Sequence, residues 1–324
     1  MSYHRFIDAA AGGVAQAPTA GEHTADTLLR SIAWTCAFLI IALTTYLVFE
    51  LGEQALPAMH RFGFDFVTGT TWDTVDDVYG VLPEIWGTLY SSLLALLLGG
   101  VFGIGIAVFI TQGFVNWRVA ATFRTAVELL AAIPSVVFGL WGIYVLIPAL
   151  RPVADWLHTH FSMVPLFGTP LNGPGLAPAA LVLSVMILPT VAAISVDALR
   201  RVPFSVTEAA YAMGTTRAEA IFRVMLPTAS SGILAALVLG FGRALGETMA
   251  LAMLIGNNNQ INLSLFAPAN TLASRLASSF PEAGRVEVQA LMFAALVLLA
   301  VTLLVNIVGL GVQQMATRKF AARR

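Results

Sequence analysis

Long apolar runs separated by shorter polar segments dominate the chain. Each run reaches about 20 residues or more, the length that an α-helix needs to cross a hydrocarbon layer roughly 30 Å thick. We predict six membrane-spanning helices, close to residues 30–50, 86–111, 124–149, 177–199, 229–256 and 287–313. The expected fold class is therefore an all-α integral membrane protein.

Composition supports this interpretation. Hydrophobic residues make up 58% of the 324 positions and charged residues only 11%, less than half of the roughly 25% found in an ordinary soluble domain. The net charge is −1 and the basic residues are scattered between the apolar runs, so nothing indicates a nucleic-acid partner. The single cysteine, Cys36, lies inside the first apolar run, which excludes an intrachain disulfide and a cysteine-based metal site.

The distribution of Lys and Arg predicts the orientation. Six spans place both termini on one side, and that side holds twelve of the 17 basic residues: Arg5, Arg30, Arg118, Arg124, Arg200, Arg201, Arg217, Arg223, Arg318, Lys319, Arg323 and Arg324. The other side holds Arg61, Arg151, Arg275 and Arg285. Because loops rich in Lys and Arg stay in the cytoplasm, we expect both termini to be cytoplasmic.

The same pattern predicts the domain boundaries. Residues 1–29 form a polar cytoplasmic tail that contains no apolar core of a signal peptide, and residues 30–85 supply the first span and an outward loop. Residues 86–313 form a core domain with five spans, and residues 314–324 form a basic cytoplasmic tail.

Two outward segments differ in character. The loop before residue 85 carries acidic residues that we interpret as a solvated surface, with a docking surface as the alternative: Asp65, Asp73, Asp76, Asp77 and Glu84. The segment from Arg151 to Pro178 is rich in Pro and Gly. We expect it to form a loop without regular helix.

A cytoplasmic helical hairpin is predicted for residues 203–227, which are too polar for a span. Ser205 with Glu208, and Thr216 with Glu219, match the capping box that starts a helix. Gly214 lies between the two starts, where a left-handed residue would end the first helix, and Pro227 would end the second.

The hairpin has two possible uses. Each short helix has an apolar side, formed by Ala209, Ala210 and Met213 in the first and by Ile221, Val224 and Met225 in the second. These sides could rest on the protein's own helix ends or on lipid headgroups, or they could bind a partner protein.

Two charged residues lie inside the fifth predicted span. A charged side chain at the centre of a membrane helix costs about 2.5 to 3.5 kcal/mol even on an insertion scale, so Arg243 and Glu247 require a reason. Their i, i+4 spacing would put them on one helix face and allow mutual neutralisation. One interpretation is a buried structural ion pair; the other is a polar path in which Arg243 binds an oxyanion and Glu247 holds it in place.

Other residues near this path carry weaker signals. Thr248 and Asn257 could add polar contacts along it. Pro134 should kink the third span, because proline removes a backbone hydrogen bond.

Several motifs resemble a known family. The hairpin resembles the EAA loop of binding-protein-dependent ABC importer permeases at Glu208, Ala209, Ala210, Gly214, Ile221, Leu226 and Pro227. Together with LAAIPSVVFGLWG at 130–142, GRALGETMA at 242–250 and IGN at 255–257, it resembles the C-type permease subunit of the high-affinity phosphate importer, the Pst system. Residues 1–29 and the stretch at 72–77 depart from that pattern.

The resemblance implies a type I ABC importer permease fold in a bacterial inner membrane. It implies that the hairpin, including Arg217, is a coupling element that docks on an ATPase, and that Arg243 and Glu247 take part in phosphate passage. The implied partners are a second, A-type permease subunit, an ATPase dimer that uses ATP and Mg²⁺, and an external phosphate-binding protein. This chain itself is expected to be non-catalytic and to bind no cofactor or metal.

An ATP-binding loop is missing from the sequence. That loop requires a Lys followed by Ser or Thr, whereas the only lysine, Lys319, precedes Phe320. Energy must then come from another subunit. The remaining alternatives are a permease for sulfate or molybdate, an ion-coupled carrier and a sensor of phosphate status.

Overall fold

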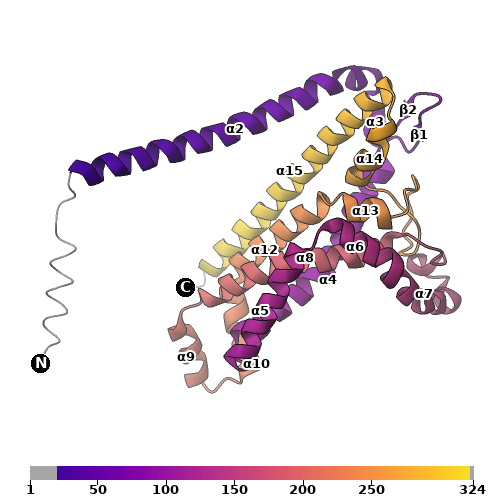
Figure 1. Cartoon of the computed structure of the whole chain (residues 1–324). Helices are drawn as coiled ribbons and strands as arrows, with labels where there is room; N and C mark the ends of the chain where they lie inside the picture. Colours follow the sequence, from indigo (N-terminus) through magenta and orange to yellow (C-terminus); the bar gives the residue numbers. More distant parts are fainter. Residues whose placement is uncertain (1–19, 322–324) are drawn as a thin grey trace, which may run out of the picture. The chain divides into compact units, whose positions relative to one another are not determined.

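The structure, a computed structural model, describes residues 20–321 and is almost entirely helical (Figure 1). It divides into two compact units, with the boundary along the chain between Glu53 and Gln54. Helix α2 spans Ala20–Phe62, so residues 20–29 of the predicted N-terminal tail are helical, and residues 1–19 lie outside the described part. The other helices and strands are α3 (Asp65–Thr68), β1 (Trp72–Asp73), β2 (Val78–Tyr79), α4 (Leu82–Thr111), α5 (Trp117–Ala132), α6 (Ser135–Trp141), the π-helical η1 (Gly142–Leu146), α7 (Ile147–Phe161), the 3₁₀ turn η2 (Pro165–Phe167), α8 (Leu176–Arg200), α9 (Phe204–Ala212), α10 (Arg217–Glu219), the π-helical η3 (Ala220–Met225), α11 (Leu226–Thr228), α12 (Ser230–Leu245), α13 (Met249–Leu254), α14 (Leu272–Ser279), the 3₁₀ turn η4 (Phe280–Glu282) and α15 (Arg285–Ala321).

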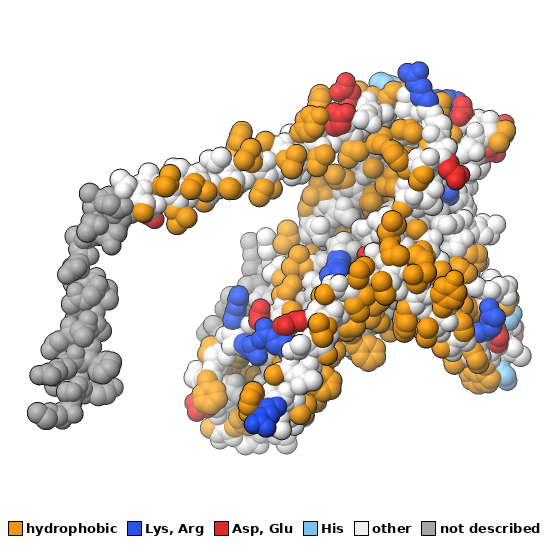
Figure 2. Space-filling model, viewed as in Figure 1, with side chains coloured by type: hydrophobic (Ala, Val, Ile, Leu, Met, Phe, Trp, Pro, Cys, Tyr) orange, Lys and Arg blue, Asp and Glu red, His pale blue; other side chains and the backbone are white. Residues whose placement is uncertain are grey.

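Helices long enough to cross a membrane form the framework of the described chain. Within residues 20–321, five helical segments are long and apolar enough to cross a membrane, and a sixth is added if the bent pair Arg217–Thr228 and Ser230–Leu245 counts as one span. On the visible face of the second unit, hydrophobic side chains cover most of the middle, while charged side chains gather mainly toward its ends (Figure 2). The prediction of an all-α membrane protein is confirmed.

Helix α8 forms the centre of the second unit, with α4 packed closely along it. A Cβ on Gly99 would lie 2.7 Å from the carbonyl oxygen of Ser184, and one on Gly103 would lie 2.9 Å from Cγ1 of Val191. Small residues four apart let two helix backbones approach each other inside a membrane. The largest hydrophobic core cluster lies around this contact and also includes α6, η1 and α13.

The third predicted span, 124–149, is not one helix. Helix α5 ends at Ala132, Ile133 and Pro134 are extended, and α6 begins at Ser135. The expected kink at Pro134 is therefore a break, because proline lacks an N–H and also disfavours helical backbone in the residue before it. The segment that can span the membrane is Ser135–Phe161 instead.

The prediction of a loop throughout 151–178 was wrong for its first part. Residues 151–161 continue α7, with Pro152 inside the helix and His158 and His160 in its last turn. Apolar residues Leu150, Ala154 and Leu157 join a small hydrophobic cluster with Leu171 and Phe266. This tertiary packing stabilises the helix despite the proline.

The segment before α4 folds into a small aromatic cap. Strands β1 and β2 pair antiparallel, with Trp72 opposite Tyr79. The ring of Phe66 stacks on Phe293 of α15, with centroids 4.3 Å apart. Burial, reinforced by the charge of Asp77, raises the pKa of Tyr79 to about 12.

Candidate functional site

The charged segment of the fifth predicted span lies at a break between two helices. Helix α12 ends at Leu245 and α13 begins at Met249, so the predicted continuous span 229–256 is interrupted at residues 246–248. Arg243 lies in the last turn of α12 with an exposed side chain. A basic residue in a helix's last turn is favoured by the partial negative charge at that end.

The predicted pairing of Arg243 with Glu247 does not occur. The described ion pairs join other residues, and the Oε1 atom of Glu247 instead accepts from the backbone N–H of Ala250 at 3.4 Å. An i, i+4 contact requires an unbroken helix, and the break after Leu245 removes that condition. The interpretation as a structural ion pair is therefore wrong.

Arg243 bonds to a neutral group. Its Nη1 atom donates to Oγ1 of Thr190 on α8, at 3.1 Å. No carboxylate within residues 20–321 forms an ion pair with this guanidinium. The positive charge is therefore not neutralised by the described part of the chain, and the remaining N–H groups can donate to a ligand.

The other two predicted path residues have local partners. The hydroxyl of Thr248 donates to the Gly246 carbonyl at 3.2 Å. Asn257 adopts a left-handed backbone with φ 49°, and its Oδ1 accepts from the hydroxyl of Ser274 at 3.2 Å. The described hydrogen bonds connect neither of them to Arg243 or to Glu247.

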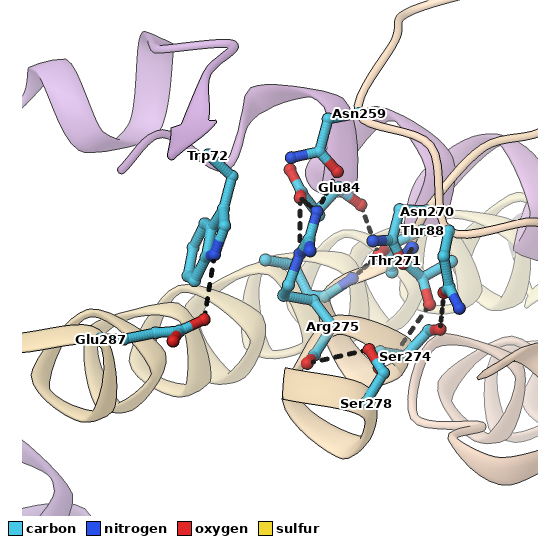
Figure 3. Close-up of polar contacts among 12 residues, drawn as sticks. Trp72, Glu84, Thr88, Asn259, Asn270, Thr271, Ser274, Arg275, Ser278 and Glu287 are labelled. Atoms are coloured by element: carbon cyan, nitrogen blue, oxygen red, sulfur yellow. Dashed lines mark hydrogen bonds and ion pairs between the residues drawn. The ribbon is translucent and has the colours of Figure 1, made fainter. Parts of the chain in front are cut away.

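A buried ion pair fixes the N-terminal end of α4 (Figure 3). Glu84, in the first turn of α4, is fully buried, and its Oε1 accepts from Nη2 of Arg275 at 2.9 Å and from Nε at 3.1 Å. The same guanidinium donates to Oδ1 of Asn259 and lies over the ring of Trp72. Sequence reasoning missed this pair and interpreted Glu84 as a solvated acid.

Helix α14 is the centre of this polar cluster. Thr271 caps its N-terminus by accepting from the N–H of Ser274, and the N–H of Leu272 donates to Thr88 Oγ1 of α4 at 2.9 Å. Ser274 bonds to Asn257 and Arg275 bonds to Asn259, so α14 is connected to both ends of the short run of asparagines. Because Leu272 and Arg275 also bond to α4, this run is linked to α4 through α14. Pro83 and Glu84 match a helix start in the sequence, but neither signals that this carboxylate is buried.

The predicted cytoplasmic hairpin is present, with one correction. Thr216 and Glu219 form the capping box of α10, and Gly214 has φ 78° at the turn. The predicted box of Ser205 and Glu208 is absent, because α9 begins at Phe204, with Pro203 instead of Ser205 at the N-cap, and no side chain caps it. Past Pro227 the chain bends by 71° between α11 and α12.

Burial divides the predicted coupling residues into two groups. Ala210 and Ile221 are buried and hold the hairpin together, and Leu226 and Pro227 are half-buried. Glu208, Ala209, Gly214 and Arg217 are exposed.

Of the large apolar side chains on the hairpin surface, Met213 was named from the sequence, but Phe204 and Phe222 were missed. Met213 is 85% exposed, Phe204 75% and Phe222 69%. Exposed apolar groups gathered on one short element are typical of a protein-binding surface. Arg217 connects this element to the α4–α5 turn, since Nη2 donates to the carbonyls of Gln112 and Gly113 and the guanidinium lies 4.7 Å from the Phe114 ring centroid.

No metal-binding group was found within the described residues: no three His, Cys, Asp or Glu side chains converge there. His158 and His160 each bond through Nδ1 to a backbone carbonyl, of Phe167 and Trp156 respectively.

Comparison with known proteins places this geometry in context. A model of the family described as "binding-protein-dependent transport system inner membrane component" matches residues 99–321. The chain is 37% identical over 279 residues to the phosphate transport system permease protein PstC of Xylella fastidiosa, covering 84% of this chain and 85% of that protein. It is 39% identical over 277 residues to phosphate transport system permease protein PstC 2 of Mycobacterium tuberculosis, covering 83% and 85% respectively.

Solved structures show a related fold. An inward-facing structure of the MetNI methionine ABC transporter matches with a TM-score of 0.53 at 20% identity, covering 73% of this chain and 95% of that chain. A second crystal form of the same transporter matches with a TM-score of 0.53 at 18% identity.

Proposed function

The chain belongs to the family of binding-protein-dependent transport system inner membrane components, and on that premise we propose that it is the permease subunit of an ATP-driven phosphate importer. The relatives that cover most of the chain at 37–39% identity carry the name of phosphate permeases. The multi-pass helical architecture and the unneutralised Arg243 agree with transport of an anion through the membrane.

The chain supplies one half of the path and takes its energy from another subunit. The exposed hairpin surface around Met213 and Phe222 docks on a separate ATPase dimer, which uses ATP and Mg²⁺. A second permease subunit completes the path, and an external binding protein delivers phosphate. Both termini face the cytoplasm, on the side of the hairpin, and the complex alternates between outward and inward access.

One observation carries the assignment of the path. Placing an arginine within a membrane helix costs about 2.5 to 3.5 kcal/mol on an insertion scale, yet the only described hydrogen-bond partner of Arg243 is a neutral hydroxyl. Hydrogen bonds from a guanidinium to an oxyanion are charge-assisted and roughly twice as strong as neutral ones. A passing phosphate therefore supplies the charge that the described residues do not.

Reconstitution tests this function. The complex, purified with its ATPase, partner permease and binding protein in proteoliposomes, should take up phosphate only with ATP and should prefer phosphate to sulfate. Arg243→Gln removes the charge and should lower phosphate uptake by roughly tenfold to 100-fold, as expected for loss of a hydrogen-bonded charge. Arg61→Gln is the matched control, because Arg61 is half-exposed and paired with Asp77.

Each rival function gives a different result. Uptake driven by an ion gradient without ATP would indicate a carrier, and equal uptake of sulfate would indicate a broader oxyanion permease. A chain whose deletion leaves uptake intact but alters phosphate signalling would be a sensor. Wild-type transport by a normally assembled Arg243→Gln complex would contradict the path assignment.

A further inference from the structure

Thr190 occupies a distinctive position on the central helix α8. It follows Pro189, which lies inside the helix, and it is half-buried, whereas its neighbours Pro189, Val191 and Ala192 are buried. Its hydroxyl is the described partner of Arg243, 53 residues away in sequence. The contact therefore joins α8 to the end of α12, at the break in the fifth predicted span.

The hydroxyl of Thr190 donates no hydrogen bond within the described structure. Thr88, Thr111 and Thr302 each donate to the carbonyl four residues earlier in their own helices. Thr190 accepts from Arg243 but makes no such backbone bond among residues 20–321. A threonine hydroxyl can accept and donate at once, so this group can hold Arg243 and still donate to an anion oxygen.

Thr190 also borders a pocket between α5 and α8. The pocket has a volume of about 230 Å³, room for several water molecules. Arg124, Glu128 and Asp197 line it together with Thr190, and Nε of Arg124 lies 2.9 Å from Oε1 of Glu128. Arg124 and Glu128 neutralise each other, and most of the other lining residues are apolar, so this pocket does not itself retain an anion.

From these contacts we infer that Thr190 is an anion-contacting and positioning residue of the translocation path. Its hydroxyl accepts a hydrogen bond from Arg243 and donates a hydrogen bond to a phosphate oxygen bound there. The α5–α8 pocket leaves this hydroxyl accessible to small molecules. This inference rests on the proposed function, because it assigns a further residue to the same path.

Substitution of Thr190 gives the first test. Thr190→Val keeps the shape of the side chain but removes the hydroxyl. In the reconstituted complex it should raise the KM for phosphate and lower the maximal uptake rate, so that the maximal rate divided by KM falls roughly tenfold. Thr190→Ser keeps the hydroxyl and should restore uptake to near the wild-type level. Wild-type transport by Thr190→Val, alongside an inactive Arg243→Gln, would overturn the inference and leave the proposed function standing. Wild-type transport by both variants would overturn this inference and the assignment of Arg243 to the path, whereas loss of ATP-dependent phosphate uptake in the wild-type complex would overturn the proposed function.

Cysteine labelling gives a second test that does not depend on the valine variant. A Cys36→Ala background removes the single native thiol, and a cysteine replacing Thr190 should react with a negatively charged methanethiosulfonate from the cytoplasmic side. Inorganic phosphate should slow that reaction. Ser195→Cys is the matched control, because Ser195 lies on the same helix and is fully buried. Equal labelling at both positions, or no protection by phosphate, would overturn the inference.

Discussion

Charged side chains in this protein occur in two contrasting environments, one buried and paired and the other exposed and without a counterion among the described residues. Glu84 is fully buried and bonded to Arg275, whose side chain is 13% exposed, so each charge is compensated inside the fold. Arg243 is exposed and bonded only to a neutral hydroxyl among the described residues. The first arrangement stabilises the structure, while the second leaves a charge available to a ligand.

The buried pair makes a stability prediction. Glu84→Gln leaves the Arg275 charge without its buried counterion, and breaking a buried pair in this way costs about 3 to 5 kcal/mol. The free energy of unfolding, measured by denaturant titration in detergent, should fall by that amount. Asp77→Asn is the control, because the Arg61–Asp77 pair is 3.6 Å long and both side chains are 40% exposed or more; exposed pairs contribute at most about 1 kcal/mol. Equal losses of unfolding free energy for both variants would show that the Glu84–Arg275 pair does not stabilise the fold.

The hairpin from α9 to α11 is the clearest example of an element with separate inner and outer faces. Figure 1 shows α9 and α10 together at one end of the second unit, with α14 and the β-strands at the other end. Ala210, Ile221 and Met225 are buried, whereas Met213 and Phe222 are exposed. The buried residues maintain the hairpin, and the exposed ones are free to bind another protein.

Docking on an ATPase can be tested at the exposed face. Met213→Asp places a charge in an apolar interface without touching the core, so the ATPase should no longer co-purify with the permease while the melting temperature stays unchanged. Met163→Asp is the matched control, because Met163 is 98% exposed and lies in the segment between α7 and η2. Retention of the ATPase by the Met213 variant would argue against this docking surface.

At the scale of the whole molecule, helices of membrane length separate two polar ends. Strands β1 and β2 and helix α14 lie at one end of the second unit, and α9 and α10 of the hairpin lie at the other (Figure 1). The excess of Lys and Arg on one side of the spans expected from the sequence predicts that the hairpin faces the cytoplasm.

Orientation can be measured with two single cysteines. In the Cys36→Ala background, Met213→Cys should react with an impermeant maleimide only from the cytoplasmic side, and Met163→Cys only from the outside, because a single span, α8, lies between them. Both positions are highly exposed, so accessibility of the thiol does not limit the reaction. Labelling of both cysteines from one side would contradict the proposed topology.

The sequence by itself determined the membrane class, the hairpin and the presence of Arg243 in an apolar segment. These features follow from local patterns: the length of apolar runs, the Thr216–Glu219 capping box and the left-handed Gly214. Such signals depend on residues close together in the chain, so no knowledge of tertiary contacts is needed to find them.

Only the tertiary structure decided which partners the charged residues take. The i, i+4 rule paired Arg243 with Glu247, but the helix breaks between them and Thr190 of α8 is the partner instead. Glu84 and Arg275 lie 191 residues apart, and α7 continues through Pro152 because Ala154 and Leu157 pack against distant residues. Contacts of this kind leave no periodic signal in the sequence, because their geometry exists only after the helices have packed.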